Sequence, residues 1–150
     1  MQMTLARALR LLARREYCSA ELRRKLRERE VPEDIVEQVL AELEAAGYLS
    51  ETRFAESFLR SRMARGETPW LAARKARERG VREEELAAAL AEAEAVFDAV
   101  DACRELVARR DPQGLRHEDE RAWQKLARFL RNKGFDAATI LRCLNEQAEA

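Results

Sequence analysis

Strand-forming residues are scarce in this 150-residue sequence. Aromatic side chains make up only 6% of the chain, and there are five glycines and three prolines. The abundant residues are alanine (27), arginine (24) and glutamate (22), all of which favour helix. This composition predicts an all-α protein and excludes a sheet-based nucleotide fold.

Residue patterns typical of catalysis or metal binding are also missing. His117 is the single histidine, and the three cysteines, Cys18, Cys103 and Cys143, are widely separated and form no CxxC pair. Neither GxxxxGK[ST] nor GxGxxG occurs, so no glycine-rich loop is available to hold nucleotide phosphates. We therefore expect a protein that is not an enzyme, without catalytic, cofactor or metal sites, whose cysteines pack in the core.

Long apolar runs are absent as well. Arg7, Arg10 and Arg14 interrupt the N-terminal residues before they reach the length of a signal-peptide core. No stretch approaches the roughly 18 apolar residues of a membrane span. We expect a cytoplasmic protein with no membrane partner.

Helix ends can be located from glycine and helix starts from capping residues. Ser19, Ser50 and Thr68 each precede a helical pattern, and Pro69 suits a first helical turn. The glycines expected to end helices in the left-handed conformation are Gly47, Gly66, Gly80 and Gly134. The predicted helices are 4–15, 19–29, 33–46, 51–65, 69–79, 83–91, 94–110, 120–132 and 137–147. No glycine or proline divides residues 82–110, so one long or kinked helix is an alternative there, and 111–118 is expected to be a mobile loop.

The apolar pattern repeats along the chain. Shifts of 50 and then 54 residues align three sets of five apolar positions, with Glu30, Gly80 and Gly134 in equivalent connections. The sets are Leu22, Leu26, Val31, Val36, Leu40; Ala72, Ala76, Val81, Leu86, Leu90; and Leu126, Leu130, Phe135, Ile140, Leu144. We predict three tandem three-helix repeats, 1–49, 50–92 and 93–150, that stack into an elongated, curved array.

Charge is segregated along the chain although the net charge is zero. Residues 1–32 carry nine basic and four acidic side chains, whereas 33–51 carry six acids and no base. Residues 52–82 carry nine basic and three acidic side chains, and 83–105 carry eight acids and one arginine. In the first two repeats the leading helices are therefore basic and the last helix is acidic.

Basic residues recur on equivalent helices of the three repeats. We name this set the basic track: Arg10, Arg14, Arg24, Arg27, Arg60, Arg62, Arg74, Lys75, Arg77, Arg128 and Arg131. One interpretation is a set of solvated helix faces with weak pairs four residues apart. The other is a surface that follows a phosphate backbone or an acidic protein groove, and segregation of the two signs by helix favours it.

Four runs of residues resemble the family of the bacterial regulatory protein RecX, over essentially the whole chain. They are ALRLLARREYCSAELRRKL at 8–26, GYLS at 47–50, RFAESFLRSR at 53–62 and WQKLARFLRNKGFDAATI at 123–140. The resemblance implies a protein of DNA repair, homologous recombination and the SOS response that binds RecA on single-stranded DNA. It further implies that the chain lies in the groove of the RecA filament, blocks filament extension and inhibits strand exchange, ATP hydrolysis and LexA cleavage.

On this hypothesis the partners are RecA and RecA-coated single-stranded DNA, with weak binding to bare DNA, and the basic track supplies the contacts. We expect a monomer. The alternatives are a sequence-independent DNA-binding helical-repeat protein that acts without RecA, and a helical-repeat adaptor for another protein. Steeply salt-dependent binding to bare DNA would favour the first alternative.

Overall fold

The structure, a computed structural model, describes residues 1–147. This part of the chain contains nine α-helices, one 3-10 turn and no strand, which confirms the prediction of an all-α protein. The elements are α1 (Gln2–Arg14), α2 (Ser19–Arg27), α3 (Glu33–Ala45), α4 (Glu51–Ala64), α5 (Pro69–Glu78), α6 (Glu83–Val96), α7 (Ala99–Arg110), η1 (Leu115–His117), α8 (Glu120–Asn132) and α9 (Ala137–Leu144).

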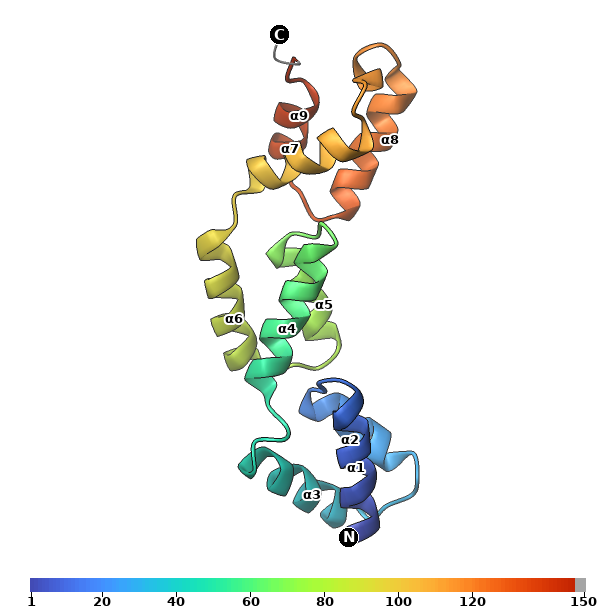
Figure 1. The fold of residues 1–150 in the computed structure, drawn as a ribbon, viewed down its shortest axis with the longest axis vertical. Helices are drawn as coiled ribbons and strands as arrows, with labels where there is room; N and C mark the ends of the chain where they lie inside the picture. Colours follow the sequence, from blue (N-terminus) through green and yellow to red (C-terminus); the bar gives the residue numbers. More distant parts are fainter. Residues whose placement is uncertain (148–150) are drawn as a thin grey trace.

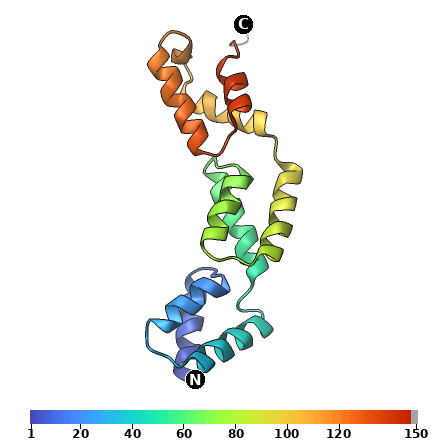
Figure 2. The ribbon, with the colours of Figure 1, turned by 180° about the vertical axis from the view of Figure 1, so that it is seen from behind.

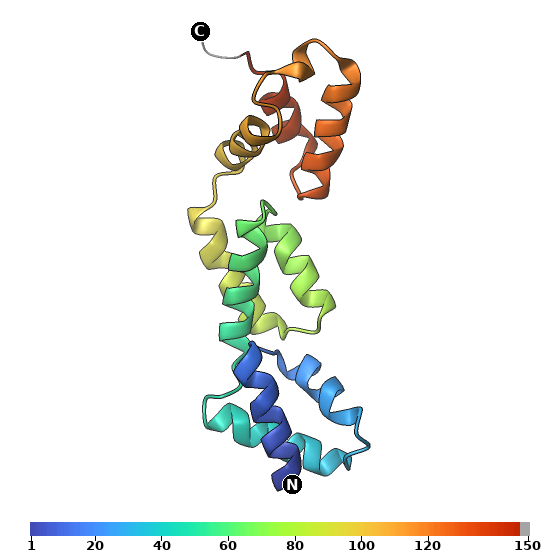
Figure 3. The same ribbon diagram turned by 45° about the vertical axis from the view of Figure 1, so that its right-hand side comes forward.

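The helices form three bundles stacked along one axis. Helices α1–α3 make repeat 1, α4–α6 make repeat 2 and α7–α9 make repeat 3 (Figure 1), and the two ends of the chain lie at opposite ends of the molecule. The view from behind shows the same gentle curve (Figure 2), and the bundles stay distinct in the turned view (Figure 3). The main helix–helix contacts all lie within a repeat. The predicted elongated, curved array of three-helix repeats is therefore confirmed.

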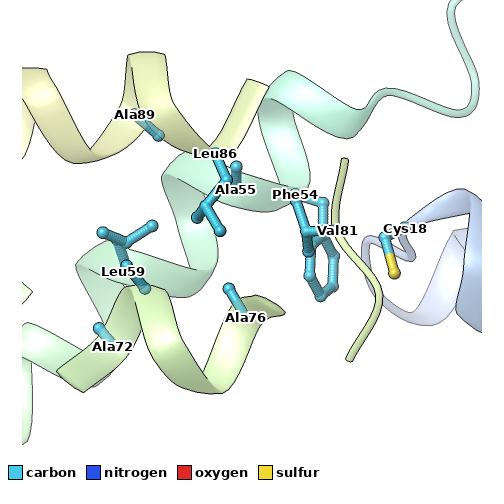
Figure 4. Close-up of a cluster of buried hydrophobic side chains, with 10 residues drawn as sticks. Cys18, Phe54, Ala55, Leu59, Ala72, Ala76, Val81, Leu86 and Ala89 are labelled. Atoms are coloured by element: carbon cyan, nitrogen blue, oxygen red, sulfur yellow. The ribbon is translucent and has the colours of Figure 1, made fainter. Parts of the chain in front are cut away.

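Each repeat has its own core, built largely from the aligned apolar positions. All fifteen of these positions are buried except Val31 and Leu90, which are half-buried. The core of repeat 2 also includes Cys18, which comes from the connection between α1 and α2 (Figure 4). Cys103 and Cys143 are buried in repeat 3, and all three cysteines are free thiols. Burial raises the pKa of Cys18 to about 11 and that of Cys103 to about 12.

Most of the predicted helix ends are confirmed. The four glycines named as helix stops all have positive φ, and the side chains of Ser50 and Thr68 accept hydrogen bonds from the N–H groups of Arg53 and Leu71. The prediction for Ser19 was wrong in detail, because Ser19 is the first helical residue and no side chain of its own helix caps α2.

The segment without glycine or proline contains two helices rather than one. Helix α6 ends at Val96, later than predicted, and α7 begins at Ala99, where the Asp98 side chain accepts a hydrogen bond from the Asp101 N–H. The residues predicted as a mobile loop, 111–118, include η1 and are fastened by Arg116. Its guanidinium pairs with Asp111 at 2.9 Å and donates to the Leu144 carbonyl at 3.1 Å. Asp111 also accepts from two backbone N–H groups of this segment.

The two junctions between repeats share one construction. In each, the connection between the second and third helices of a repeat packs on the beginning of the second helix of the repeat before it. At the first junction the Cys18 thiol donates to the Arg79 carbonyl at 3.7 Å. At the second junction the Thr68 N–H donates to the Lys133 carbonyl at 2.9 Å. Residues 18 and 68 are 50 positions apart and residues 79 and 133 are 54 apart, so both junctions use equivalent residues.

Glycine allows this close approach. A Cβ atom added to Gly80 would lie 2.7 Å from the Ala20 Cβ. A Cβ atom on Gly134 would lie 2.3 Å from the Thr68 Oγ1 and 2.8 Å from the Leu71 Cβ. The equivalent residue in repeat 1 is Glu30, which is exposed and has a φ of 55°. A side chain is tolerated there because it points into solvent rather than against another repeat.

Gly134→Ala should therefore destabilise the protein much more than Gly47→Ala. Both glycines have positive φ, 99° and 82°, which costs about 1 kcal/mol for alanine. A Cβ on Gly47 meets nothing within 4 Å, whereas a Cβ on Gly134 forces repeats 2 and 3 apart. We expect losses of about 1 kcal/mol for Gly47→Ala and about 3 kcal/mol for Gly134→Ala in urea denaturation followed by circular dichroism. Equal losses would show that the junction yields without cost.

Candidate functional site

The basic track is distributed over five helices in all three repeats. Helix α1 carries Arg10 and Arg14, α2 carries Arg24 and Arg27, α4 carries Arg60 and Arg62, α5 carries Arg74, Lys75 and Arg77, and α8 carries Arg128 and Arg131. Nine of these residues are exposed, and Arg62 and Lys75 are half-buried. Ten of these side chains fall into two groups that sequence alone did not separate, and Arg24 is intermediate between them.

Four members of the basic track are engaged in ion pairs that belong to the fold. Arg27 pairs with Glu33, and Arg77 pairs with Glu83 through two hydrogen bonds of 2.9 and 3.0 Å. These two pairs are 50 residues apart, so the same contact ties the second helix to the third in repeats 1 and 2. Each guanidinium, by hydrogen bonding, lowers the pKa of its glutamate.

The other two engaged residues converge on one buried carboxylate. Glu67 is 7% exposed and lies in the connection between α4 and α5. The Arg62 Nε lies 3.3 Å from the Glu67 carboxylate, and Lys75 also pairs with it. Because a buried carboxylate needs a partner, these two cations are committed to the structure of repeat 2.

Six members of the basic track have no such commitment. Within residues 1–147, no ion pair or side-chain hydrogen bond engages Arg10, Arg14, Arg60, Arg74, Arg128 or Arg131. We call these six the free arginines. Arg24 is intermediate, because it donates to the Arg79 carbonyl at 3.4 Å across the first junction. The free arginines occur in every repeat, so the whole length of the array offers guanidinium groups to a partner.

Some of the segregated charges form ion pairs across the first junction. Arg82 at the start of α6 pairs with Glu44 of α3 at 2.7 Å, and Arg53 of α4 pairs with Glu16 at 3.0 Å. Acidic α3 and basic residues of repeat 2 therefore attract each other within the chain. The acids of α3 are consequently not all available to an external basic partner.

Three arginines outside the basic track also lie close together. Arg15, Arg65 and Arg79 line a hollow beside Phe58 at the first junction, together with Arg62 of the track. The sequence prediction left them out because each lies at the edge of a helical face pattern: Arg15, Arg65 and Arg79 are the C-cap residues of α1, α4 and α5. All three are the last residues of predicted helices, and this shared position is the signal that could have found them.

Residues 1–147 contain no cluster of side chains that is typical of a catalytic or metal site. His117 is exposed beside a cleft of repeat 3, and no group of three His, Cys, Asp or Glu side chains in residues 1–147 is placed to hold a metal ion. Over the same residues, no helix is both long enough and apolar enough to cross a bilayer. The exposed arginines are thus the feature of this surface that suits a charged partner.

Comparison with known proteins identifies the family. The models of the first, second and third three-helix domains of RecX match residues 5–43, 50–90 and 97–144. The regulatory protein RecX of Pseudomonas entomophila (strain L48) is 37% identical over 138 residues, 92% of this chain and 87% of the relative. That of Halorhodospira halophila (strain DSM 244 / SL1) is 41% identical over 133 residues, 89% of this chain and 81% of the relative.

Solved structures share the fold. A crystal structure of regulatory protein RecX superposes with a TM-score of 0.74 at 21% identity, covering 97% of this chain and 71% of the other. RecX from Lactobacillus salivarius gives a TM-score of 0.73 at 20% identity, covering 95% and 93% of the two chains. With all three domain models matched in order and relatives above 35% identity along most of the chain, this protein belongs to the RecX family of regulatory proteins.

Proposed function

We propose that this protein binds the RecA filament on single-stranded DNA and inhibits its recombinase, ATPase and coprotease activities. It does so by lying in the filament groove and blocking filament extension, in the cytoplasm and as a monomer. Membership of the RecX family supports the choice of partner. The mode of action requires no active site on this chain, because occupancy of the groove is sufficient.

The observation that carries the proposal is the recurrence of free arginines along an elongated array. Arg14 lies in repeat 1, Arg60 and Arg74 in repeat 2, and Arg131 in repeat 3, each exposed. A rigid sphere would present such residues to one subunit, whereas three stacked repeats can present them to neighbouring subunits at once. Binding at several linked points increases affinity without any single strong contact. Guanidinium groups suit both phosphate and carboxylate groups on such a partner.

Addition of this protein to assembled RecA filaments, well below the RecA concentration, should progressively lower the rate of ATP hydrolysis. The reason is that one molecule at a filament end stops the addition of many subunits. The measurement is ATP hydrolysis by the cognate RecA on single-stranded DNA, with correctly folded protein verified by circular dichroism. An unchanged rate even at equal concentration would overturn the proposal and favour the DNA-binding or adaptor alternatives.

A further inference from the structure

A hollow at the junction of repeats 1 and 2 is lined by four arginines. Its volume is about 320 Å³, and its walls come from the end of α1, the outer face of α4 and the end of α5. Arg15 belongs to repeat 1, and Arg62, Arg65 and Arg79 belong to repeat 2. The two repeats together therefore build a concave basic surface that neither repeat has alone.

The carboxylates near these arginines do not balance their charge. Arg15 and Arg79 share the single carboxylate of Glu21, at 2.9 and 3.7 Å, and Glu21 is only 10% exposed. Arg62 shares Glu67 with Lys75, as described for the basic track. Each carboxylate thus lies behind two cations, and an excess of positive charge faces the hollow.

Arg65 adds to this excess. No ion pair or side-chain hydrogen bond engages its guanidinium within residues 1–147. Glu16 is the acid that lines the hollow. One of its carboxylate oxygens pairs with Arg53 at 3.0 Å, and the other is buried without a hydrogen-bond partner in residues 1–147. Four arginines in the lining outnumber this one carboxylate, so the potential in the hollow is positive.

Aromatic rings hold three of the guanidinium groups in place. Arg62 and Arg79 lie 5.6 and 5.1 Å from the centre of the Phe58 ring, and Arg15 lies 3.7 Å from the centre of the Tyr17 ring. Cation–π contact and the buried glutamates fix these side chains before any ligand arrives, which reduces the entropy lost on binding. Ser57 and Ser61, one helical turn apart on α4, also line the hollow. The Ser57 hydroxyl donates to the Phe54 carbonyl at 3.3 Å, so the neutral donor that faces a ligand is the Ser61 hydroxyl.

We propose that this hollow binds the phosphodiester backbone of a nucleic-acid strand. Several arginine forks around one space match the geometry of phosphate oxygens, and the Ser61 hydroxyl adds a neutral donor. Contacts to phosphate oxygens carry no sequence information, so we expect strand binding at this hollow to be independent of sequence. The binding site rests on the proposed function in one respect, since the strand it would meet is the DNA inside the RecA filament.

The site also links strand binding to the shape of the array. A phosphate held between Arg15 and Arg65 bridges repeats 1 and 2 and adds to the hydrogen bonds and ion pairs that already cross this junction. Occupancy of the hollow should fix the angle at the first junction. On this proposal the first junction binds DNA in addition to the free arginines.

The test measures binding of the full chain to a fluorescein-labelled 20-nucleotide poly-dT strand, without RecA, by fluorescence anisotropy at several KCl concentrations. Each phosphate contact contributes about 0.7 to the slope of log affinity against log salt for single strands. The double variant Arg65→Ala/Arg79→Ala should lower that slope by about 1.4 and weaken binding at low salt by roughly tenfold. The control Arg121→Ala/Lys125→Ala removes the same charge from exposed positions of α8 and should leave the slope unchanged.

Three outcomes would overturn the site. They are an unchanged slope in the double variant, an equal fall in both double variants, and an absence of strand binding by the unmodified protein. Parallel titrations with ATP and inorganic phosphate separate the sources of the phosphate group. Loss of ATP binding in the double variant with strand binding intact would assign the hollow to a free nucleotide and reject the strand.

A second variant keeps the proposal testable if the double variant fails to fold. If circular dichroism shows that the double variant is unfolded, the single variant Arg65→Ala replaces it. This variant removes a side chain that makes no ion pair or side-chain hydrogen bond in residues 1–147, and it should lower the slope by about 0.7. Failure of the strand test leaves inhibition of RecA ATP hydrolysis measurable in its own assay. Conversely, strand binding with no effect on RecA would reject the proposed function and keep the site.

Discussion

Replacing Glu51 with alanine should lower the free energy of unfolding by about 4 kcal/mol, although Glu51 makes no ion pair in the described residues. Its side chain is 2% exposed and lies at the start of α4, at the first junction. One carboxylate oxygen accepts the Ser19 N–H at 2.6 Å and the other accepts the Arg82 N–H at 2.9 Å. These two N–H groups stand at the beginnings of α2 and α6, and neither helix has a side-chain cap of its own.

The size of this effect follows from what the alanine variant leaves behind. Two backbone N–H groups lose a charged acceptor in a place that water reaches poorly, at about 2 kcal/mol each. The negative charge also sits at the positive ends of two helix dipoles, which adds to the loss. Because Glu51 joins α2 of repeat 1 to α6 of repeat 2, its removal should also uncouple the repeats and broaden the unfolding transition.

Guanidinium denaturation followed by circular dichroism measures both effects. Glu51→Gln is the intermediate case, because an amide has one acceptor oxygen and its NH₂ group would face a second donor; we expect about half the loss. Glu56→Ala, on the same helix at a half-buried position, serves as the control and should change stability by less than about 0.5 kcal/mol. A Glu51→Ala protein as stable as the Glu56→Ala protein would show that the bridge contributes nothing.

The division into three repeats was predictable because its signals are local. Glycine at a helix end, an N-cap such as Thr68 and apolar residues at helical spacing each act within a few residues. Asp98, which separates α6 from α7, follows the same rule but is not accompanied by glycine or proline, so the boundary there was misplaced. Capping by a single aspartate is a weaker signal than a break in composition.

The junctions were not predictable, because their key residues look ordinary in the sequence. Glu51 follows Ser50 and resembles any acid in a first helical turn, yet it serves two other helices. Gly80 and Gly134 were assigned as helix stops, which is correct, but their second task of admitting a neighbouring repeat depends on tertiary contact. One sign of this second task is present in the sequence: the equivalent position of repeat 1 holds Glu30, so the turn itself does not require glycine.

The sequence predicts the basic track as one surface, whereas the structure divides it into basic residues that are engaged in ion pairs and arginines that are free. Sequence spacing places arginines on a helix face, but it does not tell whether an acid lies across the next connection. Arg77 pairs with Glu83 in repeat 2. In repeat 3 the equivalent positions are Arg131 and Ala137, and because alanine has no carboxylate, Arg131 makes no ion pair in residues 1–147. Ion pairs across the helix connections thus decide which basic side chains remain free to bind a partner. A count based only on helix faces in the sequence overestimates the number of free basic side chains.

This division changes which variant tests the partner-binding surface. Reversal of Lys75 or Arg77 would break contacts with Glu67 or Glu83 and confuse loss of binding with loss of stability. One free arginine from each repeat avoids this difficulty. The triple variant Arg14→Glu/Arg74→Glu/Arg131→Glu disturbs no ion pair in residues 1–147 and should fold like the parent.

We expect this triple variant to lose inhibition of RecA ATP hydrolysis at substoichiometric concentration and to bind the filament about 100-fold more weakly. Lost attraction and new repulsion together weaken binding by about 1 kcal/mol for each of these solvent-exposed charges, so three reversals reach about 3 kcal/mol, or two orders of magnitude in affinity. The effect should diminish as salt is raised, since exposed charges are screened. Filament binding can be measured by anisotropy of labelled protein and compared with the ATPase rate.

The matched control is Arg29→Glu/Arg121→Glu/Lys125→Glu, which changes the net charge equally at exposed positions outside the basic track. If both triple variants lose binding to the same extent, net charge rather than the recurring arginines governs association. If neither loses it while both remain folded, the free arginines do not face the filament. A selective loss in the first variant alone requires contacts in more than one repeat, because any single reversal supplies only about a third of the expected free-energy change.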